Sequence, residues 1–283
     1  MKGGRIMPVN VRSNNGEVAI SVRRLVKKYK DVVAVNDISF SVNKSEFFAF
    51  LGPNGAGKTT TIKILCTLIR QTSGDVYING YDTIKNRKDV RMSIGLVFQD
   101  PTLDNDLSAL ENLNFHAKLY GMNRKNVRER IDHILDFIDL YDYKDKPIKL
   151  LSGGMKRRLE VGRGLLHSPS VLFLDEPTAG LDIQTRINMW DFIDKLRKEE
   201  ETTIFLTTHY IEEAENCDRI AVIDKGKIIA IDTPSELKKS VKSEDGKIPT
   251  LSDAFISLVG RKVRGEAGTA IDRMRELNRV LRR

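Results

Sequence analysis

Residues 47–60, FFAFLGPNGAGKTT, place a glycine-rich loop between a short apolar run and a helical pattern. The run Phe47–Leu51 has the length and composition of a buried strand. Gly52–Thr59 then match the pattern G-x-x-x-x-G-K-[ST], and Thr59–Ile69 carry apolar residues at helical spacing. Because a phosphate-binding loop requires a strand before it and a helix after it, this stretch predicts a nucleotide-binding α/β fold.

The predicted phosphate-binding loop supplies the first candidate site residues. Its glycines let backbone N–H groups wrap the β-phosphate, and the positive end of the following helix adds to the attraction. We expect Lys58 to reach the β- and γ-phosphates and the Thr59 hydroxyl to ligate Mg²⁺. The loop alone leaves the identity of the nucleotide open. The residues assigned to nucleotide binding are Gly52, Pro53, Asn54, Gly55, Ala56, Gly57, Lys58, Thr59 and Thr60.

A second apolar run, Val171–Leu174, ends in two acidic residues. In a nucleotide-binding fold the first acid at such a strand end approaches the Mg²⁺ shell, which makes Asp175 a candidate metal ligand. Glu176 then lies near the position of an attacking water and is a candidate general base. The alternative is that both acids only cap the loop into the next helix, which is expected to begin near Ile183.

Length and composition favour one large α/β domain with an insertion, or two modest domains. The chain has 283 residues, 40% of them hydrophobic, which excludes a wholly disordered protein.

The sequence shows no membrane-spanning or secretion signal. The longest apolar runs are strand-sized, short of the ~20 residues of a membrane span, and no signal peptide is expected. Cys66 and Cys217 are isolated, which fits a reducing cytosol and predicts neither a metal site nor a disulfide.

Positive charge is concentrated at the C-terminal end of the chain. The formal net charge is +8, from 47 basic and 39 acidic residues. Residues 261–283 contain eight basic and three acidic residues and so account for +5 of this charge. The rest of the chain is nearly balanced, so the charge does not predict a nucleic-acid-binding core.

Strand and helix patterns alternate on both sides of a helical middle section. The middle section, from Pro101 to His167, includes an amphipathic stripe from Val127 to Ile138. This arrangement is typical of a parallel-sheet α/β core with a helical insert. Further predicted strands are Val18–Leu25, Ile38–Val42, Val76–Asn79, Gly95–Phe98, Thr203–Leu206, Ile220–Ile223 and Lys227–Ile231, and further predicted helices are Gln184–Arg197, Ile211–Asn216 and Ala270–Leu281.

Residues 151–160, LSGGMKRRLE, contain a second helix start suited to an anion. Ser152 can cap the helix, and the two glycines after it leave several backbone N–H groups pointing outward. Taken alone, this is an ordinary helix start with a solvated basic face. Since the chain already has a phosphate-binding loop, a second anion site has no obvious ligand.

Five segments occur in a fixed order along the chain. They are Gly52–Thr60, Leu151–Gly154, Leu174–Pro177, Ala179–Asp182 and His209. In order and spacing they closely resemble the ATP-binding-cassette (ABC) ATPases, over roughly residues 18–237. The resemblance implies ATP and Mg²⁺ as ligands. It also implies an α/β P-loop core with a mixed sheet, an N-terminal antiparallel β subdomain and an inserted α-helical subdomain.

The resemblance implies limits for these parts. Residues 1–17 are an N-terminal extension, residues 18–240 the ABC ATPase domain with its helical insertion at about 100–167, and residues 241–283 a basic C-terminal extension. One departure concerns Gly162 and Gly164, which stand where similar sequences have alanine. Glycine inside a helix costs about 1 kcal/mol relative to alanine, so a less rigid helix is expected there.

Three residues receive catalytic roles. Glu176 keeps the role of general base. Gln99 resembles the glutamine that reaches Mg²⁺ and the attacking water, and His209 resembles the histidine that holds the γ-phosphate and positions Glu176. Without the resemblance, a lone histidine at this place would be interpreted as an ordinary loop residue.

The remaining roles concern nucleotide binding between subunits. The resemblance implies that Ser152, Gly153 and Gly154 contact the γ-phosphate of ATP held in another subunit's loop. Asp182 would help to join the two subunits. Tyr29 resembles the aromatic residue that stacks on adenine, and a strand-end core aromatic is the alternative. The second anion site therefore has a ligand if a partner subunit supplies it.

The function favoured by the resemblance is the ATPase subunit of a multisubunit exporter. The expected partners are a separate transmembrane permease subunit and a second copy or a paralogous ATPase, with no nucleic acid. Met155 and Leu251–Phe255 resemble drug- and polysaccharide-type exporter ATPases, the latter segment those of the daunorubicin-resistance type. The expected location is cytoplasmic, on the inner face of the cell membrane.

Two other functions are open to an ABC ATPase. Soluble members in DNA repair, chromosome maintenance or translation usually carry a very long coiled coil or two cassettes, whereas only residues 61–150 separate the two phosphate motifs here. A module that only binds nucleotide would have lost catalytic residues, and the presence of Gln99, Glu176 and His209 argues against it. The sequence does not identify the transported substrate.

Overall fold

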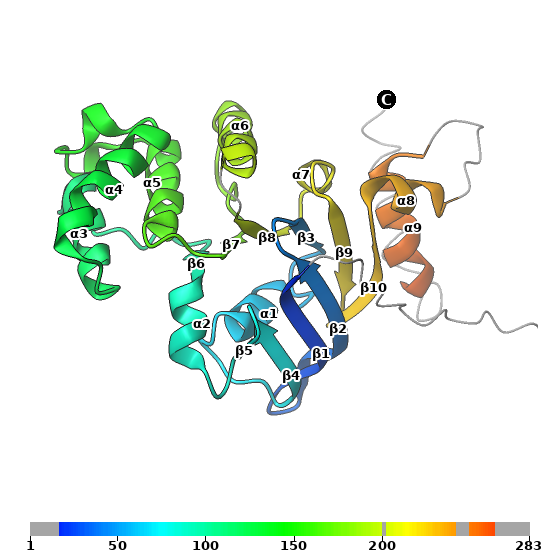
Figure 1. Cartoon of the computed structure of the whole chain (residues 1–283). Helices are drawn as coiled ribbons and strands as arrows, with labels where there is room; N and C mark the ends of the chain where they lie inside the picture. Colours follow the sequence, from blue (N-terminus) through cyan, green and yellow to red (C-terminus); the bar gives the residue numbers. More distant parts are fainter. Residues whose placement is uncertain (1–16, 200–201, 242–248, 264–283) are drawn as a thin grey trace, which may run out of the picture.

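The computed structural model describes residues 17–199, 202–241 and 249–263. Two β-sheets form its centre, and a helical subdomain extends from one side (Figure 1). Within these residues the larger sheet has six strands in the order β10-β9-β3-β8-β7-β6, and the smaller has four in the order β2-β1-β4-β5. The expected fold class is confirmed: an α/β core with a mixed sheet, an antiparallel β subdomain and a helical insert.

The elements have the following limits. The strands are β1 Val18–Tyr29, β2 Val32–Asn43, β3 Phe47–Leu51, β4 Ser73–Ile78, β5 Tyr81–Asp82, β6 Ile94–Val97, β7 Val171–Asp175, β8 Thr203–Thr208, β9 Arg219–Asp224 and β10 Lys227–Asp232. The helices are α1 Lys58–Leu65, α2 Arg87–Ser93, α3 Ala109–Leu119, α4 Arg124–Phe137, α5 Gly153–Leu165, α6 Ile183–Glu199, α7 Ile211–Ala214, α8 Pro234–Lys239 and α9 Leu251–Val263. None of the helices in the described ranges is long and apolar enough to cross a lipid bilayer.

The larger sheet is parallel at its centre and ends in an antiparallel hairpin. β3 pairs in parallel with β8 and β9, and β7 pairs in parallel with β8 and β6, whereas β10 is antiparallel to β9. Every residue of β3, β7 and β8 is buried, as expected for parallel strands covered on both faces. Side chains alternate along β3, so that Phe47, Ala49 and Leu51 belong to one apolar cluster and Phe48 and Phe50 to another. The sheet therefore separates two cores.

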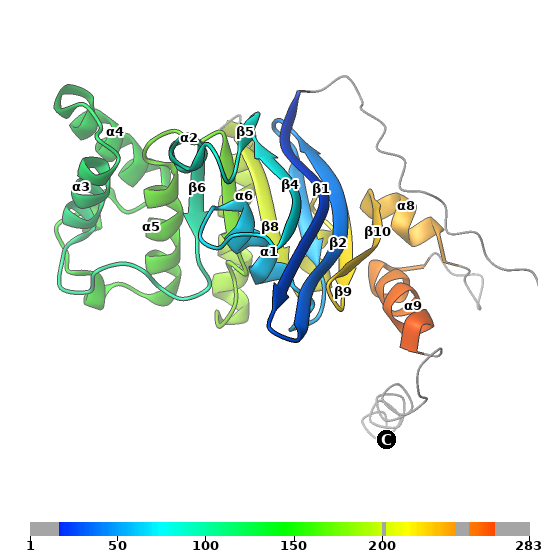
Figure 2. The ribbon, with the colours of Figure 1, turned by 90° about the horizontal axis from the view of Figure 1, so that it is seen from below.

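The smaller sheet covers one face of the larger one. β1, β2 and β4 lie side by side as a curved layer (Figure 2). Phe40 of β2 stacks on Phe48 of β3, with ring centroids 5.8 Å apart, and also lies against Phe50 and Phe205. Aromatic side chains thus join the two sheets within a shared apolar cluster.

The helical subdomain consists of α3, α4 and α5, beside the β6 edge of the larger sheet (Figures 1 and 2). α3 begins with a capping box, in which Ser108 and Glu111 each accept a hydrogen bond from the other's backbone N–H. The predicted apolar stripe on α4 is buried at Ile131 and Ile134 and partly buried at its start, Val127. α5 packs against α4 on one side and β6 on the other, and so attaches the insert to the sheet.

The two glycines inside α5 allow this close packing. A Cβ at Gly162 would lie 2.9 Å from the Ile134 side chain of α4. A Cβ at Gly164 would lie 3.2 Å from Cδ1 of Leu172 on β7, and a Cβ at Gly95 of β6 would lie 2.4 Å from the carbonyl oxygen of Gly164. Gly162 and Gly164 lie within one unbroken helix, α5. The two glycines lower the helix propensity of α5, but a larger residue at either position would obstruct its close contacts with neighbouring elements.

Several elements differ in length from the sequence prediction. β2 spans Val32–Asn43 where Ile38–Val42 is predicted, and β4 spans Ser73–Ile78 where Val76–Asn79 is predicted. β1 and α1 show the physical reason. β1 continues to Tyr29, because it still pairs with β2 after the alternation of apolar and polar residues has ended. α1 ends at Leu65 rather than Ile69, because Thr67 adopts a left-handed conformation with φ of 60°. The end of β1 is thus set by backbone pairing and the end of α1 by a single dihedral angle, and not by side-chain periodicity.

Helix α9, the last of the described elements, packs on α7, α8 and β10 (Figure 1). Leu251 and Ala254 of α9 are buried in the same apolar cluster as Phe47. The domain limit expected at residue 240 stays a prediction, although this packing ties α9 to the core. The predicted helix Ala270–Leu281 lies outside the described residues.

The single tryptophan of the chain joins α6 to the start of β3. Trp190 stacks on Phe47, with ring centroids 6.1 Å apart. The indole N–H is buried without a hydrogen-bond partner among the described residues. α6 is therefore packed directly against the strand that leads into the glycine loop.

A cluster of aromatic rings joins α3 to the end of α5. His116 of α3 and Tyr120, the C-cap residue of this helix, lie beside His167, and the ring centroids of Tyr120 and His167 are 3.9 Å apart. Burial lowers the pKa of His116 to about 4, with smaller contributions from Arg163 and His167. Burial also lowers the pKa of His167.

We predict that this cluster makes the protein less stable in mild acid. Between pH 6.5 and about 4, His116 takes up a proton in the unfolded chain but not in the folded one. The free energy of unfolding therefore falls as the pH is lowered through this range. His116→Gln should reduce that fall, whereas His133→Gln, at an exposed position of α4, should not. Urea unfolding at about pH 7 and about pH 5 measures the difference, and the same fall in wild type and His116→Gln would contradict the prediction.

Candidate nucleotide site

The glycine loop lies between β3 and α1, as the sequence predicts. Gly55 and Gly57 have φ of 79° and 104°, a region that residues with a side chain adopt only at a cost. At Gly57 a Cβ would also lie 2.5 Å from the carbonyl oxygen of Ala34 on β2. Position 57 therefore requires glycine for both conformation and space. α1 begins at Lys58, so its N-terminus opens onto the loop.

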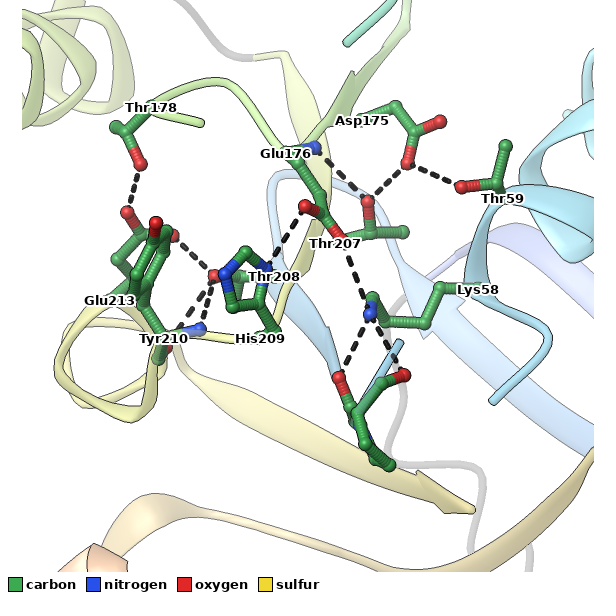
Figure 3. A network of polar contacts seen from close by, with 12 residues as sticks. Lys58, Thr59, Asp175, Glu176, Thr178, Thr207, Thr208, His209, Tyr210 and Glu213 are labelled. Atoms are coloured by element: carbon green, nitrogen blue, oxygen red, sulfur yellow. Dashed lines mark hydrogen bonds and ion pairs between the residues drawn. The ribbon is translucent and has the colours of Figure 1, made fainter. Parts of the chain in front are cut away.

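The side chain of Lys58 turns back over the loop. It is 4% exposed, and its Nζ donates to the carbonyl oxygens of Gly52 at 2.8 Å and Pro53 at 3.2 Å. The same Nζ lies 3.2 Å from Oε1 of Glu176 (Figure 3). A buried ammonium group needs a partner of opposite charge, and the Glu176 carboxylate provides it. One cation thus joins the glycine loop to the acidic end of β7.

Asp175, the last residue of β7, faces two threonine hydroxyls. Its Oδ1 accepts hydrogen bonds from Thr207 at 2.5 Å and from Thr59 at 3.4 Å (Figure 3). Burial raises the pKa of the Asp175 carboxyl, while these two hydroxyls act against the shift. A carboxylate beside the threonine of the loop is the kind of oxygen pair that suits Mg²⁺. The residues therefore fit the predicted ion, and the assignment of Thr59 and Asp175 stays a prediction.

Glu176 and His209 form the next contact. Nδ1 of His209 lies 3.0 Å from Oε2 of Glu176 (Figure 3). Because β7 and β8 are parallel neighbours, the residues after their carboxyl ends lie side by side. Glu176 has φ of 49°, which turns the chain away from the strand, and its N–H donates to the Thr207 carbonyl oxygen at 3.1 Å. The structure thus brings Lys58, Glu176 and His209 together in a row.

A buried carboxylate that the sequence analysis missed lies beside this row. Glu213 of α7 is 2% exposed and accepts hydrogen bonds from the hydroxyls of Thr178 and Thr208 (Figure 3). Thr178 follows Glu176 by two residues, and Thr208 directly precedes His209. Glu213 therefore links the segment after β7, which contains Glu176, to the end of β8, which precedes His209. α7 spans four residues, too few to show a periodicity that could have identified it.

Two other candidate residues are accessible and lie outside the row. Tyr29 ends β1 and is 44% exposed, with Nζ of Lys27 lying 4.7 Å from its ring centroid. Gln99 is exposed in the segment after β6. These positions are compatible with contact to a nucleotide, and both roles stay predictions.

The serine–glycine helix start and Asp182 are exposed helix caps. Ser152 accepts a hydrogen bond from the Met155 N–H at 3.3 Å, and Asp182 accepts one from the Thr185 N–H at 3.0 Å. The hydroxyl and N–H of Thr185 lower the pKa of Asp182. Gly153 is exposed next to Ser152. Both caps are thus accessible to another molecule, as the predicted interface between subunits requires.

The motifs and their order match a known family. A sequence model of the family described as ABC transporter matches residues 35–179, a range that contains the glycine loop, the serine–glycine helix start and the acidic strand end. This chain belongs to the ABC transporter family. The resemblance stated from the motifs is therefore confirmed.

Relatives of this ABC protein are named as ATP-binding proteins. The probable multidrug ABC transporter ATP-binding protein YbhF of Escherichia coli (strain K12) is 36% identical over 249 residues, which cover 88% of this chain and 43% of YbhF. The daunorubicin resistance ATP-binding protein DrrA3 of Streptomyces coeruleorubidus is 40% identical over 223 residues, which cover 78% of this chain and 70% of DrrA3. The chain thus spans less than half the length of YbhF.

A solved structure extends the likeness to three dimensions. The ATP-binding cassette MJ0796, in a dimeric post-hydrolysis state bound to ADP and Pi, is 27% identical and superposes with a TM-score of 0.68. The match covers 76% of this ABC protein and 98% of MJ0796. The two chains therefore share the fold of an ATP-binding cassette.

We predict that Glu213→Gln destabilises the folded protein by about 1–3 kcal/mol, because charge-assisted hydrogen bonds are lost inside it. The matched control is Glu212→Gln, at the exposed neighbouring position, where a change below about 0.5 kcal/mol is expected. Urea unfolding of both variants measures the effect. If position 213 proved no more sensitive than position 212, the two hydroxyl contacts would not stabilise the fold.

Proposed function

We propose that this ABC protein is the ATP-binding and ATP-hydrolysing subunit of a multisubunit exporter. The observation that carries the proposal is the row of Lys58, Glu176 and His209, joined by contacts of 3.2 Å and 3.0 Å. It combines a phosphate-binding lysine with a carboxylate and an imidazole that can act on water. The names of the relatives, multidrug transporter and daunorubicin resistance, support export as the direction.

ATP phosphates bind to the backbone N–H groups of residues 52–60 and to Nζ of Lys58, while Tyr29 stacks on the adenine. Lys58 then exchanges its contacts with loop carbonyls and with Glu176 for contacts with phosphate oxygens. The exchange releases one carboxylate oxygen of Glu176, which accepts a proton from the attacking water. Binding of the substrate thereby prepares the base.

His209 keeps Glu176 in position. Its Nδ1 contacts Oε2 of the carboxylate, which leaves the other ring nitrogen for the γ-phosphate. Thr59, Asp175 and Gln99 would hold Mg²⁺, which would supply positive charge opposite the phosphates. Gln99 would also orient the attacking water, so the proposal uses residues that follow three strands, β6, β7 and β8.

Catalysis in this proposal needs two subunits. The exposed start of α5, with Ser152, Gly153 and Gly154, offers backbone N–H groups to an anion. Its ligand is the γ-phosphate of ATP in the loop of the facing subunit, and Asp182 lies at the same interface. The dimeric state of the MJ0796 cassette supports this arrangement. The facing subunit is a second copy or a paralogous ATPase.

The two ATPase subunits act on a separate transmembrane permease at the cytoplasmic face of the cell membrane. The name of YbhF, a probable multidrug ABC transporter ATP-binding protein, supports such a partner. Neither this name nor that of DrrA3 supports the soluble alternative in DNA repair or translation. Residues 18–240 would be the ATPase domain of this subunit, with flanking extensions.

Glu176→Gln should lower the ATPase rate by about 100- to 10,000-fold, because the amide cannot take up the proton. ATP binding should persist, and an ATP-bound dimer should accumulate. Glu212→Gln, at an exposed position of α7, should keep the wild-type rate. Phosphate release measures turnover, and size-exclusion chromatography with MgATP measures the dimer. An unchanged rate would remove Glu176 from the role of base.

The partner is tested in membranes. A tagged chain purified from detergent-solubilised membranes should bring with it an integral membrane protein of about six spans, each roughly 20 apolar residues long, because export requires a path through the bilayer. Mass spectrometry identifies the protein, and an untagged strain serves as control. Recovery of nucleic acid without a membrane protein would instead support the soluble alternative.

A further inference from the structure

Arg157 is a buried cation to which the proposed mechanism assigns no role. It lies on α5, one helical turn after Gly153, and is 6% exposed. Its guanidinium donates to three successive carbonyl oxygens at the end of β7. The distances are 2.7 Å to Pro177, 3.2 Å to Glu176 and 3.4 Å to Asp175. One side chain of the helical subdomain therefore holds the backbone that carries the proposed base and metal ligand.

The same guanidinium also reaches the segment of Gln99. Nη1 of Arg157 donates to the carbonyl oxygen of Phe98, the residue before Gln99, and to Oε2 of Glu160 at 2.9 Å. The other oxygen of Glu160 accepts a hydrogen bond from the Thr102 N–H at 2.7 Å. Arg157 and Glu160 together thus hold both ends of the segment 98–102.

The geometry of these contacts requires an arginine. A guanidinium is a planar fork whose donors point in fixed directions, whereas a lysine ammonium is a single point with three donors. Only the fork can serve the end of β7 and the segment 98–102 at once. A buried ion pair gives little net stability, because desolvation offsets the attraction, so the pair is weak evidence for a stabilising role alone.

We propose that the Arg157–Glu160 pair is a positioning unit that links the start of α5 to Glu176 and Gln99. This inference rests on the proposed function, in which the start of α5 contacts ATP of the facing subunit. A shift of α5 on that contact moves Arg157, which passes the shift to the backbone of residues 175–177 and of residue 98. Hydrolysis, and not ATP binding, therefore depends on the pair.

The conservative variant Arg157→Lys tests the link in the full-length chain. It should lower kcat about 10- to 100-fold, the scale expected when catalytic groups are displaced without being removed. KM and the affinity for ATP should stay within about two-fold of wild type, and the ATP-dependent dimer should still form. Phosphate release, binding of a fluorescent ATP analogue and size-exclusion chromatography give these values.

Arg158→Lys is the matched control. Arg158 is the next residue of α5, and its Nη1 pairs with Asp139 at 2.9 Å on the surface. All measured values of this variant should stay at the wild-type level. A second test variant, Glu160→Gln, keeps Arg157 and the size of the side chain but removes the negative charge. It should also lower kcat more than KM, and it serves if Arg157→Lys does not fold.

Three outcomes would overturn the inference. The first is a kcat of Arg157→Lys and Glu160→Gln within about two-fold of wild type. The second is a parallel loss of kcat, ATP affinity and thermal midpoint, which would indicate a structural role only. The third is a wild-type chain whose phosphate release equals that of Glu176→Gln. That last result would contradict the proposed function itself, and so it is distinguishable from the other two.

Discussion

The parallel pairing of β3 with β8 and of β8 with β7 is the constraint on which the rest of the site depends. In this register Leu51 lies opposite Thr208, and Asp175 opposite Thr207. The glycine loop, Glu176 and His209 follow directly after these residues, so the alignment of three buried strands sets their spacing. A slip of one residue would turn every side chain of a strand to the other face. The chemistry is thus positioned by the most completely buried part of the fold.

The strand ends also gather buried charges, which the structure arranges in pairs. Lys58 faces Glu176, and Arg157 faces Glu160, with every side chain of these pairs less than a tenth exposed. Removing one member of such a pair leaves an uncompensated charge and typically costs about 3–5 kcal/mol. The cost arises because the remaining charge is left buried without a partner, and it does not mean that the intact pair adds net stability. Conservative substitutions, which keep size or charge, are for this reason the informative ones.

Much of the site could be predicted because its motifs border strands with strong local patterns. The glycine loop and the acids at 175 and 176 come directly after buried apolar runs, and the structure places all of them at one edge of the sheet. Arg157 and Glu213 could not be found in this way, because they contact residues 59 and 35 positions distant in the sequence. The length of β1 depends on its partner strand for the same reason. Local periodicity predicts which elements form. Contacts between residues far apart in the sequence decide where these elements end and which side chains hold them together.

The stacking of Trp190 on Phe47 has a spectroscopic consequence. As the single tryptophan, Trp190 accounts for all tryptophan emission of the protein. It reports on one contact, between the helix that begins after Asp182 and the strand that leads into the glycine loop. Its indole N–H has no hydrogen-bond partner in the described part of the chain, so blue-shifted emission is expected from the folded protein. The molecule thus carries an intrinsic optical probe at the junction of α6 and the strand that leads into the glycine loop.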